Sequence, residues 1–225
     1  MTLIDLPVGS IVTDKKTKFN NKPIEWIVTD HEKYQGGAVL LSKDILCCRP
    51  FDNPKESYKN VGRREYGSNR WTDSDIREWL ETEFYRKSFS SKLAALAKPV
   101  WNVTELSKYD RGLYGCAKDV TEDTVFLLSD IEIGGKVYDE TLELFKGESK
   151  KYLTAECCPG LTWYWWLRSP DAGDSSNARI VYTDGSLSNG GAYYGCYGVR
   201  PACVISSSAP VKKRKSGGYK FDWER

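Results

Sequence analysis

Residues 163–170 read Trp-Tyr-Trp-Trp-Leu-Arg-Ser-Pro, a dense aromatic run that ends in a proline. The alternation along this run predicts a β-strand that buries one face. Pro170 ends the strand, because a proline cannot donate a hydrogen bond to a neighbouring strand. We expect the aromatic side chains of residues 163–166 to belong to the hydrophobic core rather than to form a platform on which sugars stack.

Apolar and β-branched runs elsewhere in the chain predict further strands. They cover residues 24–29, 38–46, 100–103, 124–128 and 198–205. The first two are bounded by Asn-Asn and Gly-Gly turns, which suggests a hairpin or a meander. Strands followed by helices and then by more strands are typical of the α+β class.

Two helices with clear start signals are predicted between the strands. Thr72 or Asp73 caps the first, because short polar side chains satisfy the free N–H groups of a first turn. The apolar residues of this helix recur at helical spacing and predict one buried stripe: Ile76, Trp79, Leu80 and Phe84. The second helix begins at Ser90 or Ser91, and Pro99 stops it.

The domain organisation is predicted to be simple. A short third helix is expected over residues 138–145, and neither a fixed repeat nor a linker composition divides the chain. We therefore predict one domain over residues 1–207. Residues 208–225 lack an apolar period and contain Lys-Lys-Arg-Lys at positions 212–215, which predicts a flexible basic tail.

The composition excludes several classes of protein. Lys and Arg number 33 against 31 Asp and Glu, so the net charge of +2 argues against a dedicated nucleic-acid-binding domain. Hydrophobic residues at 40% and charged residues at 28% argue against disordered and membrane proteins. No apolar run approaches the ~18 residues that a membrane span requires.

The chain offers few groups for metal binding or acid–base catalysis. A catalytic zinc usually takes two or three histidines, and we interpret the single histidine, His31, as a solvated loop residue. The seven cysteines are odd in number and show no CxxC spacing. We expect free thiols in a reducing compartment, no signal peptide at the start of the chain, and neither a metal nor a cofactor.

Residues 171–198 differ in composition from the rest of the chain. These 28 residues contain 6 Gly, 4 Ser, 4 Tyr and 2 Asn but neither Lys nor Glu. Ordinary surface loops are rich in Lys and Glu, whereas binding surfaces of the antibody type favour Tyr, Ser, Gly and Asn. Asp184-Gly185 predicts a hairpin turn within the segment. The composition therefore favours a binding surface over a hairpin whose tyrosines simply pack.

Two motifs give the chain a resemblance to a known family. WWLRSP at residues 165–170 and GVRPA at residues 198–202, with Asn-Ala at 177–178 and Asp-Gly at 184–185 between them, resemble a family of bacterial and phage proteins of unknown function. Upstream segments match as well, and they lie at residues 24–26, 40–42, 69–71, 76–80 and 125–129. The resemblance covers roughly residues 7–206.

The resemblance implies a fold and a function. Members of that family are among the targets of diversity-generating retroelements, which rewrite the 3′ end of a gene with errors at template adenines. It implies an α+β, C-type-lectin-like (formylglycine-generating-enzyme-like) single domain whose variable segment is residues 171–198. Adenine-directed change of Asn codons gives Tyr, Ser, Asp, Gly, Cys, Thr and Arg. The implied variable, ligand-contacting positions are Arg179, Tyr182, Ser186, Ser188, Asn189, Gly190, Tyr193, Tyr194, Cys196 and Tyr197.

The motif residues are implied to hold the backbone of the variable segment. They are Trp165, Trp166, Leu167, Arg168, Gly198, Val199, Arg200 and Pro201. We expect Arg168 and Arg200 to pair with buried carboxylates or carbonyls rather than with a ligand. The implied function is ligand binding without catalysis by a cytoplasmic or virion-associated protein. The partner is expected to be a protein or a surface glycan.

Two alternatives remain open. The chain could be a structural or virion-associated module whose segment is not diversified. Less favoured is an oxidoreductase of the formylglycine-generating type, which would use Cys196 and Cys203 as a copper-binding pair, although the spacing does not match that family. The Glu-Pro-Asn and Trp-Asn-Asp ligand sets of calcium-dependent lectins are absent from the sequence.

Overall fold

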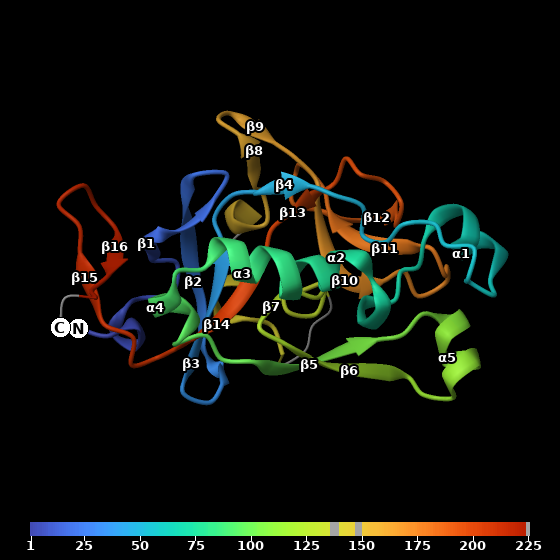
Figure 1. Cartoon of the computed structure of the whole chain (residues 1–225), viewed down its shortest axis with the longest axis horizontal. Coiled ribbons are helices and arrows are strands. Elements are labelled where there is room, and N and C mark those ends of the chain that lie inside the picture. The colour runs from blue at the N-terminus through green and yellow to red at the C-terminus, as the bar shows by residue number, and fades with distance from the viewer. Residues whose placement is uncertain (136–139, 147–149, 224–225) are drawn as a thin grey trace.

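Two β-sheets organise the chain in the computed structural model, which describes residues 1–135, 140–146 and 150–223. In the described residues the larger sheet has seven strands, in the spatial order β15-β16-β1-β2-β3-β14-β7. In that order they are Val211–Lys213, Tyr219–Phe221, Ile11–Phe19, Lys22–Tyr34, Gly37–Ser42, Ala202–Ser206 and Val125–Phe126. Helices lie against the sheets, so the chain has a mixed α+β fold (Figure 1).

The second sheet has five strands in the described residues, in the order β12-β11-β10-β13-β4. They are Leu187–Gly191, Asn177–Val181, Trp165–Pro170, Gly198–Val199 and Cys47–Cys48. The central strand β10 is antiparallel to β11 and parallel to β13. The predicted strand at residues 163–170 is therefore confirmed, with Pro170 as its last residue.

The prediction that this strand buries only one face is wrong. All six residues of β10 are buried. Trp166 packs against Phe51 on one side of the sheet, and the Arg200 guanidinium lies 4.9 Å from the centre of the Trp165 ring. A central strand with packing on both faces shows continuous burial rather than alternation.

The predicted strand at residues 198–205 is two strands in two different sheets. β13 belongs to the five-stranded sheet and β14 to the seven-stranded sheet, where β14 pairs with β3. Pro201 lies between them and has no N–H to continue the first ladder. The Arg200 side chain is buried at the break, where it donates to the carbonyl oxygens of Ser42 and Tyr152. This segment joins the two sheets.

The other predicted strands exist with different boundaries. β2 is longer than the predicted segment 24–29, and β3 ends at Ser42 rather than at residue 46. β5 (Val100–Glu105) pairs with β6 (Lys118–Asp123), which the sequence did not predict. A short hairpin of β8 (Glu156–Cys158) and β9 (Leu161–Thr162) precedes β10.

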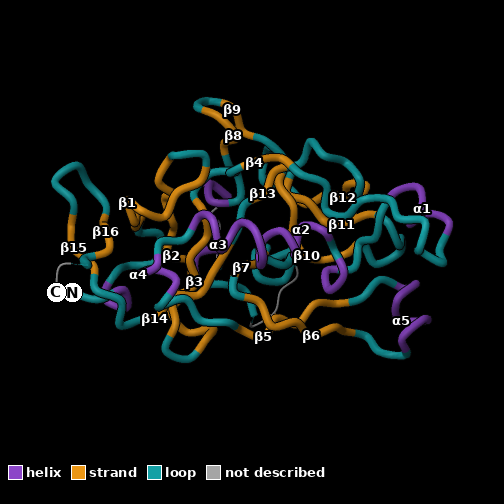
Figure 2. Tube along the Cα trace, viewed as in Figure 1, coloured by secondary structure: helices purple, strands orange, loops and turns teal. Residues whose placement is uncertain are grey.

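The predicted helix from residue 72 begins later. Ser74 caps it, because Thr72 and Asp73 lie in a preceding 3₁₀ turn. α2 (Asp75–Trp79), a π-helical turn (Leu80–Phe84) and α3 (Tyr85–Ser88) form one continuous helix (Figure 2). Its predicted apolar stripe is buried, which confirms the periodicity argument.

The remaining helices are short. Ser90 caps α4 (Ser91–Ala94), and α1 (Val61–Tyr66) and α5 (Lys108–Tyr114) were not predicted. The predicted helix at 138–145 is a 3₁₀ turn at Glu143–Phe145, and its residues 138 and 139 lie outside the described residues.

The predicted flexible tail from residue 208 is wrong. β15 and β16 form a hairpin, and β16 pairs in parallel with β1 at the edge of the larger sheet. Val211 and Phe221 are buried. These two apolar side chains anchor the hairpin, while the basic residues between them give the segment the composition of a tail.

Candidate functional site

Seven aromatic rings form a continuous series at the end of the five-stranded sheet, near β12, β13 and α1 (upper right in Figure 1). We call them the tyrosine surface: Tyr66, Trp163, Tyr164, Tyr182, Tyr193, Tyr194 and Tyr197. The ring centres of Tyr66 and Tyr193 are 5.4 Å apart, and those of Tyr193 and Tyr194 are 4.3 Å apart. The series therefore begins at α1 and enters the loop between β12 and β13.

The second half of the series connects this loop to the start of β10. Tyr197 lies 5.9 Å from Tyr194 and 5.7 Å from Tyr164. Tyr164 in turn lies 4.5 Å from Tyr182 and 5.0 Å from Trp163. Segments that are up to about 130 residues apart in the sequence thus supply one surface.

The loop that carries three of these tyrosines is held by hydrogen bonds to fixed elements. The Tyr193 N–H donates to the Tyr66 carbonyl at 3.1 Å, and the Arg49 N–H donates to the Tyr197 carbonyl at 3.1 Å. The Trp163 indole N–H donates to the Cys196 carbonyl at 2.8 Å. A loop fixed in this way loses little further entropy when a partner binds.

Tyr197 connects the surface to the core. Its ring lies edge-on to Trp166 at 4.7 Å, and Trp166 packs on Phe51 at 5.6 Å. Tyr182 and Tyr194, by contrast, are 40% and 43% exposed. Tyr197, in the middle of the series, therefore packs on the core, and the exposed rings of Tyr194 and Tyr182 lie on either side of it.

Hydrogen bonds between neighbouring tyrosines raise the pKa of two hydroxyls of the surface. A hydrogen bond to Tyr194 raises the pKa of Tyr193 to about 12, and a hydrogen bond to Tyr182 raises the pKa of Tyr164. Neutral hydroxyls can both donate and accept hydrogen bonds. The surface thus combines apolar ring area with uncharged polar groups.

Gly190 lies beneath Tyr197. It is buried, and a Cβ at this position would lie 2.4 Å from Tyr197 Cε2. The implied role of Gly190 as a ligand-contacting position does not fit this geometry, because the Tyr197 ring covers it. Gly190 instead provides the space that the ring occupies.

Replacing Gly190 with Ala is expected to displace the Tyr197 ring from Trp166. We expect the free energy of unfolding to fall by about 1–3 kcal/mol, as for overpacking in a core, with a change in the near-UV circular dichroism. Gly112→Ala in α5 is the matched control, because no atom lies within 4 Å of its added Cβ. Equal denaturation curves for the two variants would contradict this packing.

The other implied ligand-contacting positions divide between the two faces of the β11–β12 hairpin. Arg179 pairs with Asn189 and Ile180 pairs with Ser188, so Arg179 and Asn189 face away from Ser188. Arg179 Nη1 donates to Asn189 Oδ1 at 2.5 Å, and Asn189 donates to the Asp171 carboxylate. The structure therefore places Arg179 and Asn189 in a polar network apart from the tyrosine surface.

The remaining implied positions lie beside the rings or in turns. Cys196 is exposed in the loop between Tyr194 and Tyr197. Ser186 is exposed in the predicted hairpin turn, where its N–H donates to Asp184 Oδ1 at 2.9 Å. The turn itself is confirmed, since the Tyr182 N–H donates to the Ser186 carbonyl.

Sequence reasoning missed three members of the surface. Trp163 and Tyr164 were assigned to the core, yet both are only half-buried. Their position just before the WWLRSP motif was the available signal. Tyr66, which is 44% exposed, carries no sequence signal, because only the fold brings α1 beside the loop.

The motif residues are buried, and their polar groups bond to other parts of the chain. Trp165 Nε1 donates to the Leu153 carbonyl, and Trp166 Nε1 donates to the Arg49 carbonyl. Arg168 pairs with the buried carboxylate of Glu132, with 2.5 Å between Nη1 and Oε2. The arginines thus have the structural partners that the sequence analysis expected.

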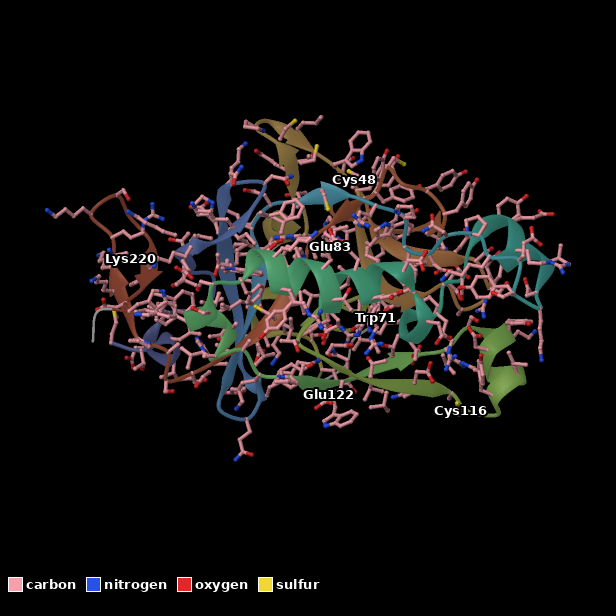
Figure 3. All side chains as sticks on the ribbon, in the orientation of Figure 1. Cys48, Trp71, Glu83, Cys116, Glu122 and Lys220 are labelled. Carbon is pink, nitrogen blue, oxygen red and sulfur yellow. The ribbon has the colours of Figure 1, made fainter. Side chains whose placement is uncertain are left out.

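Cys196 and Cys203, the pair of the oxidoreductase alternative, lie in different surroundings. Cys203 is buried in β14, and burial raises the pKa of its thiol, whereas Cys196 is exposed. Figure 3 shows Cys48 and Cys116 in different parts of the molecule. Among residues 1–135, 140–146 and 150–223, no group of three or more Cys, His, Asp or Glu side chains is arranged to hold a metal ion.

The interpretation of His31 as a solvated loop residue is wrong. It lies within β2 and is half-buried, and its Nε2 is 2.8 Å from the Leu6 carbonyl oxygen.

A separate finding concerns membranes. Within the described residues, every helix is too short or too polar to cross a membrane.

Comparison with known proteins gives one match. Residues 35–207 match a family described as a domain of unknown function, DUF6273. This range contains both sequence motifs and the whole tyrosine surface. No curated protein and no solved structure matches the chain.

Proposed function

Since the chain belongs to the DUF6273 family, whose description assigns no activity, we propose its function from its geometry: it recognises a partner through the tyrosine surface. The observation that carries this proposal is the series of seven rings in contact, exposed at Tyr182 and Tyr194. Tyrosine supplies a large amphipathic contact area at a low entropic cost, which is why binding loops favour it. The partner is a protein or a surface glycan, and no chemical step is involved.

We further propose that the fold is C-type-lectin-like and that a diversity-generating retroelement rewrites residues 171–198. The contrast between a buried strand and an exposed segment favours this proposal. The WWLRSP strand is buried throughout, while the loop and turn between the two motifs carry exposed Tyr182, Tyr194 and Cys196. Such a support tolerates changes in the displayed side chains. A cytoplasmic or virion-associated location fits this role.

The double variant Tyr182→Ala/Tyr194→Ala is expected to lose binding by about 100-fold or more, because exposed aromatic anchors dominate interface energies. A glycan array and a protein array would first identify a ligand of the wild type, and its dissociation constant would then be compared. The melting temperature is expected to change little, because both side chains are at least 40% exposed.

Tyr114→Ala is the matched control for this experiment. Tyr114 is 47% exposed on α5, outside the tyrosine surface. It is expected to bind the ligand as the wild type does. Wild-type affinity in the double variant, or an equal loss in the control, would contradict recognition through the tyrosine surface.

A further inference from the structure

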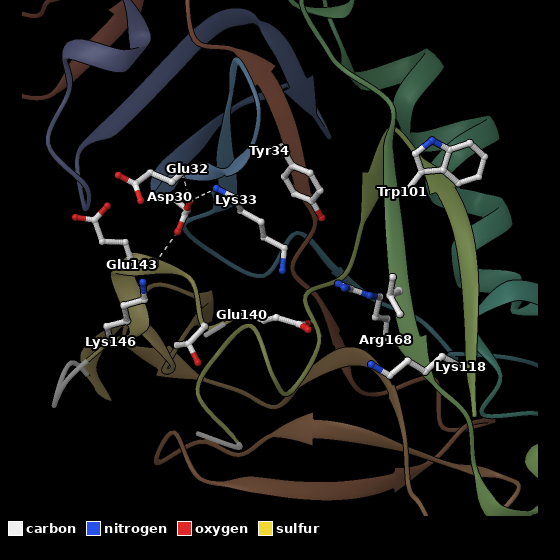
Figure 4. Close-up of a pocket in the computed structure, with 12 residues that line it drawn as sticks. Asp30, Glu32, Lys33, Tyr34, Trp101, Lys118, Glu140, Glu143, Lys146 and Arg168 are labelled. Atoms are coloured by element: carbon white, nitrogen blue, oxygen red, sulfur yellow. Dashed lines mark hydrogen bonds between the residues drawn. The ribbon is translucent and has the colours of Figure 1, made fainter. Parts of the chain in front are cut away.

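A cavity of about 760 Å³ lies outside the tyrosine surface and plays no part in the function proposed above. It is enclosed by the end of β2, the β5–β6 hairpin, β10 and residues 140–146 (Figure 4). Small-molecule sites in proteins usually have volumes of roughly 300–1,000 Å³. The cavity is therefore large enough for a small organic ligand.

Arg168 supplies an unpartnered donor to this cavity. Its side chain is only 3% exposed, and three hydrogen bonds fix it: Nε to Thr104 Oγ1 and Nη1 to the Leu127 carbonyl and Glu132 Oε2. Within the described residues, Nη2 has no hydrogen-bond partner, although Arg168 lines the cavity. A buried guanidinium with a free N–H pair suits a carboxylate oxygen.

Lys33 adds a second cation beside Arg168. Its Nζ lies 2.8 Å from Glu132 Oε1, so two cations face one buried carboxylate, one at each oxygen. Burial opposes the charge on Glu132, but Arg168 and Lys33 outweigh it and lower the pKa of this carboxyl to about 2. The ion group keeps one positive charge in excess.

Four acidic residues and two further lysines complete the charged lining: Asp30, Glu32, Glu140, Glu143, Lys118 and Lys146. The buried Asp30 carboxylate accepts hydrogen bonds from three backbone N–H groups, those of Glu32, Lys33 and Glu143. Glu140 is exposed, and among the described residues no cation pairs with it. Figure 4 shows its side chain extending into the cavity toward Lys33 and Arg168.

One part of the wall is apolar and aromatic. The Tyr34 ring is fixed by the hydrogen bond from its hydroxyl to Asn102 Oδ1 at 2.9 Å. Val103 and Trp101 also line the cavity and lie on the same face of β5. The cavity thus presents cationic donors, carboxylates that include Glu140, and an apolar patch.

We propose that this cavity binds a zwitterionic small molecule of the α-amino-acid class. The ligand carboxylate accepts hydrogen bonds from Arg168 Nη2 and Lys33 Nζ. The ammonium group pairs with Glu140, and the side chain packs against Tyr34 and Val103. No residue of the tyrosine surface takes part.

Three probes test the carboxylate and the ammonium group separately. They are L-phenylalanine, 3-phenylpropionate and phenethylamine, which share a phenyl ring and differ in these charged groups. Calorimetric titration of the full chain is expected to give the tightest binding for L-phenylalanine. 3-Phenylpropionate is expected to bind about 10-fold more weakly and phenethylamine about 100-fold more weakly, because each lacks a charge-assisted contact. Equal binding of L-phenylalanine and 3-phenylpropionate, or no binding of any probe, overturns the proposal.

Glu140 is exposed, so its variant keeps the test independent of folding. Glu140→Gln is expected to remove the preference for L-phenylalanine over 3-phenylpropionate, and Lys33→Gln to weaken both by about 10-fold. Glu83→Gln, at an exposed site on the π-helical turn, is the control and is expected to keep the preference. The Tyr182→Ala/Tyr194→Ala variant is expected to bind the probes normally, and a loss of binding there would place the probe on the tyrosine surface and overturn the proposal.

Discussion

Replacing Glu132 with Gln is expected to lower the free energy of unfolding by about 3–5 kcal/mol, the range for breaking a buried ion pair. Glu132 is 1% exposed and binds two cations, Arg168 at 2.5 Å and Lys33 at 2.8 Å. Its Oε2 also accepts the Ser129 N–H at 2.7 Å. A neutral amide leaves two cations without a counter-charge beneath β10. Urea denaturation monitored by tryptophan fluorescence would measure the loss.

Glu83→Gln is the matched control for this prediction. Glu83 pairs with Lys87 at 3.2 Å across one helical turn, and both side chains are more than half exposed. Solvent screens such pairs, so this variant is expected to unfold at nearly the same urea concentration as the wild type. Similar losses of unfolding free energy in the two variants would show that the ion pairs of Glu132 stabilise the fold no more than an exposed pair does.

The pH dependence follows from the direction of the pKa shift. The pKa of Glu132 falls from its ordinary value of 4.5 to about 2 in the folded protein, so folding favours its ionised form. Its stabilising contribution is complete above about pH 4.5 and is lost as the pH falls through 2. The difference in stability between wild type and Glu132→Gln is therefore expected to shrink across this interval. A constant difference down to pH 2 would contradict the assignment.

Replacing Trp166 with Ala is expected to cost about 3–5 kcal/mol, as for other large core aromatics. Trp166 is fully buried and contacts Phe51 and Tyr197, and its indole N–H satisfies the Arg49 carbonyl. The loss of the indole ring would also remove the ring contact that supports Tyr197. We therefore expect ligand binding to weaken together with stability.

Trp101→Ala provides the same chemical change at an exposed position. Trp101 is 66% exposed on β5, and its removal is expected to change stability by within about 0.5 kcal/mol. A large loss of stability in this control, or none in Trp166→Ala, would contradict the division between core and exposed tryptophans.

By the same reasoning, variants that include Tyr197→Ala are expected to lose some stability, because the Tyr197 ring packs on Trp166.

The sequence predicted the elements that local pattern determines. The strand at WWLRSP, the apolar stripe from Ile76 to Phe84 and the Asp184-Gly185 turn all depend on neighbours a few residues away. The break at Pro201 was missed because β13 and β14 are both apolar, and only their partner strands place them in different sheets. The tail was misread because its anchors, Val211 and Phe221, are separated by basic residues.

Only the part of the candidate site that lies within residues 171–198 could be predicted from the sequence. The composition of residues 171–198 marked Tyr182, Tyr193, Tyr194 and Tyr197, which the structure brings into one ring series. Tyr66 joins them through a contact across 127 residues of sequence, given by its carbonyl and the Tyr193 N–H. Arg179 and Asn189 were grouped with the tyrosines because composition does not reveal the face of a hairpin on which a side chain lies.

The most direct test of recognition by a diversified surface is to sequence the gene and its flanks in many closely related isolates. We expect substitutions confined to adenine positions in codons of the displayed residues, such as Tyr182, Ser186, Tyr194 and Cys196, with a template repeat and a reverse-transcriptase gene nearby. Codons for buried residues such as Ile180 and Val199 are expected to stay constant. An invariant segment, or substitutions equally frequent at buried positions, would contradict the account.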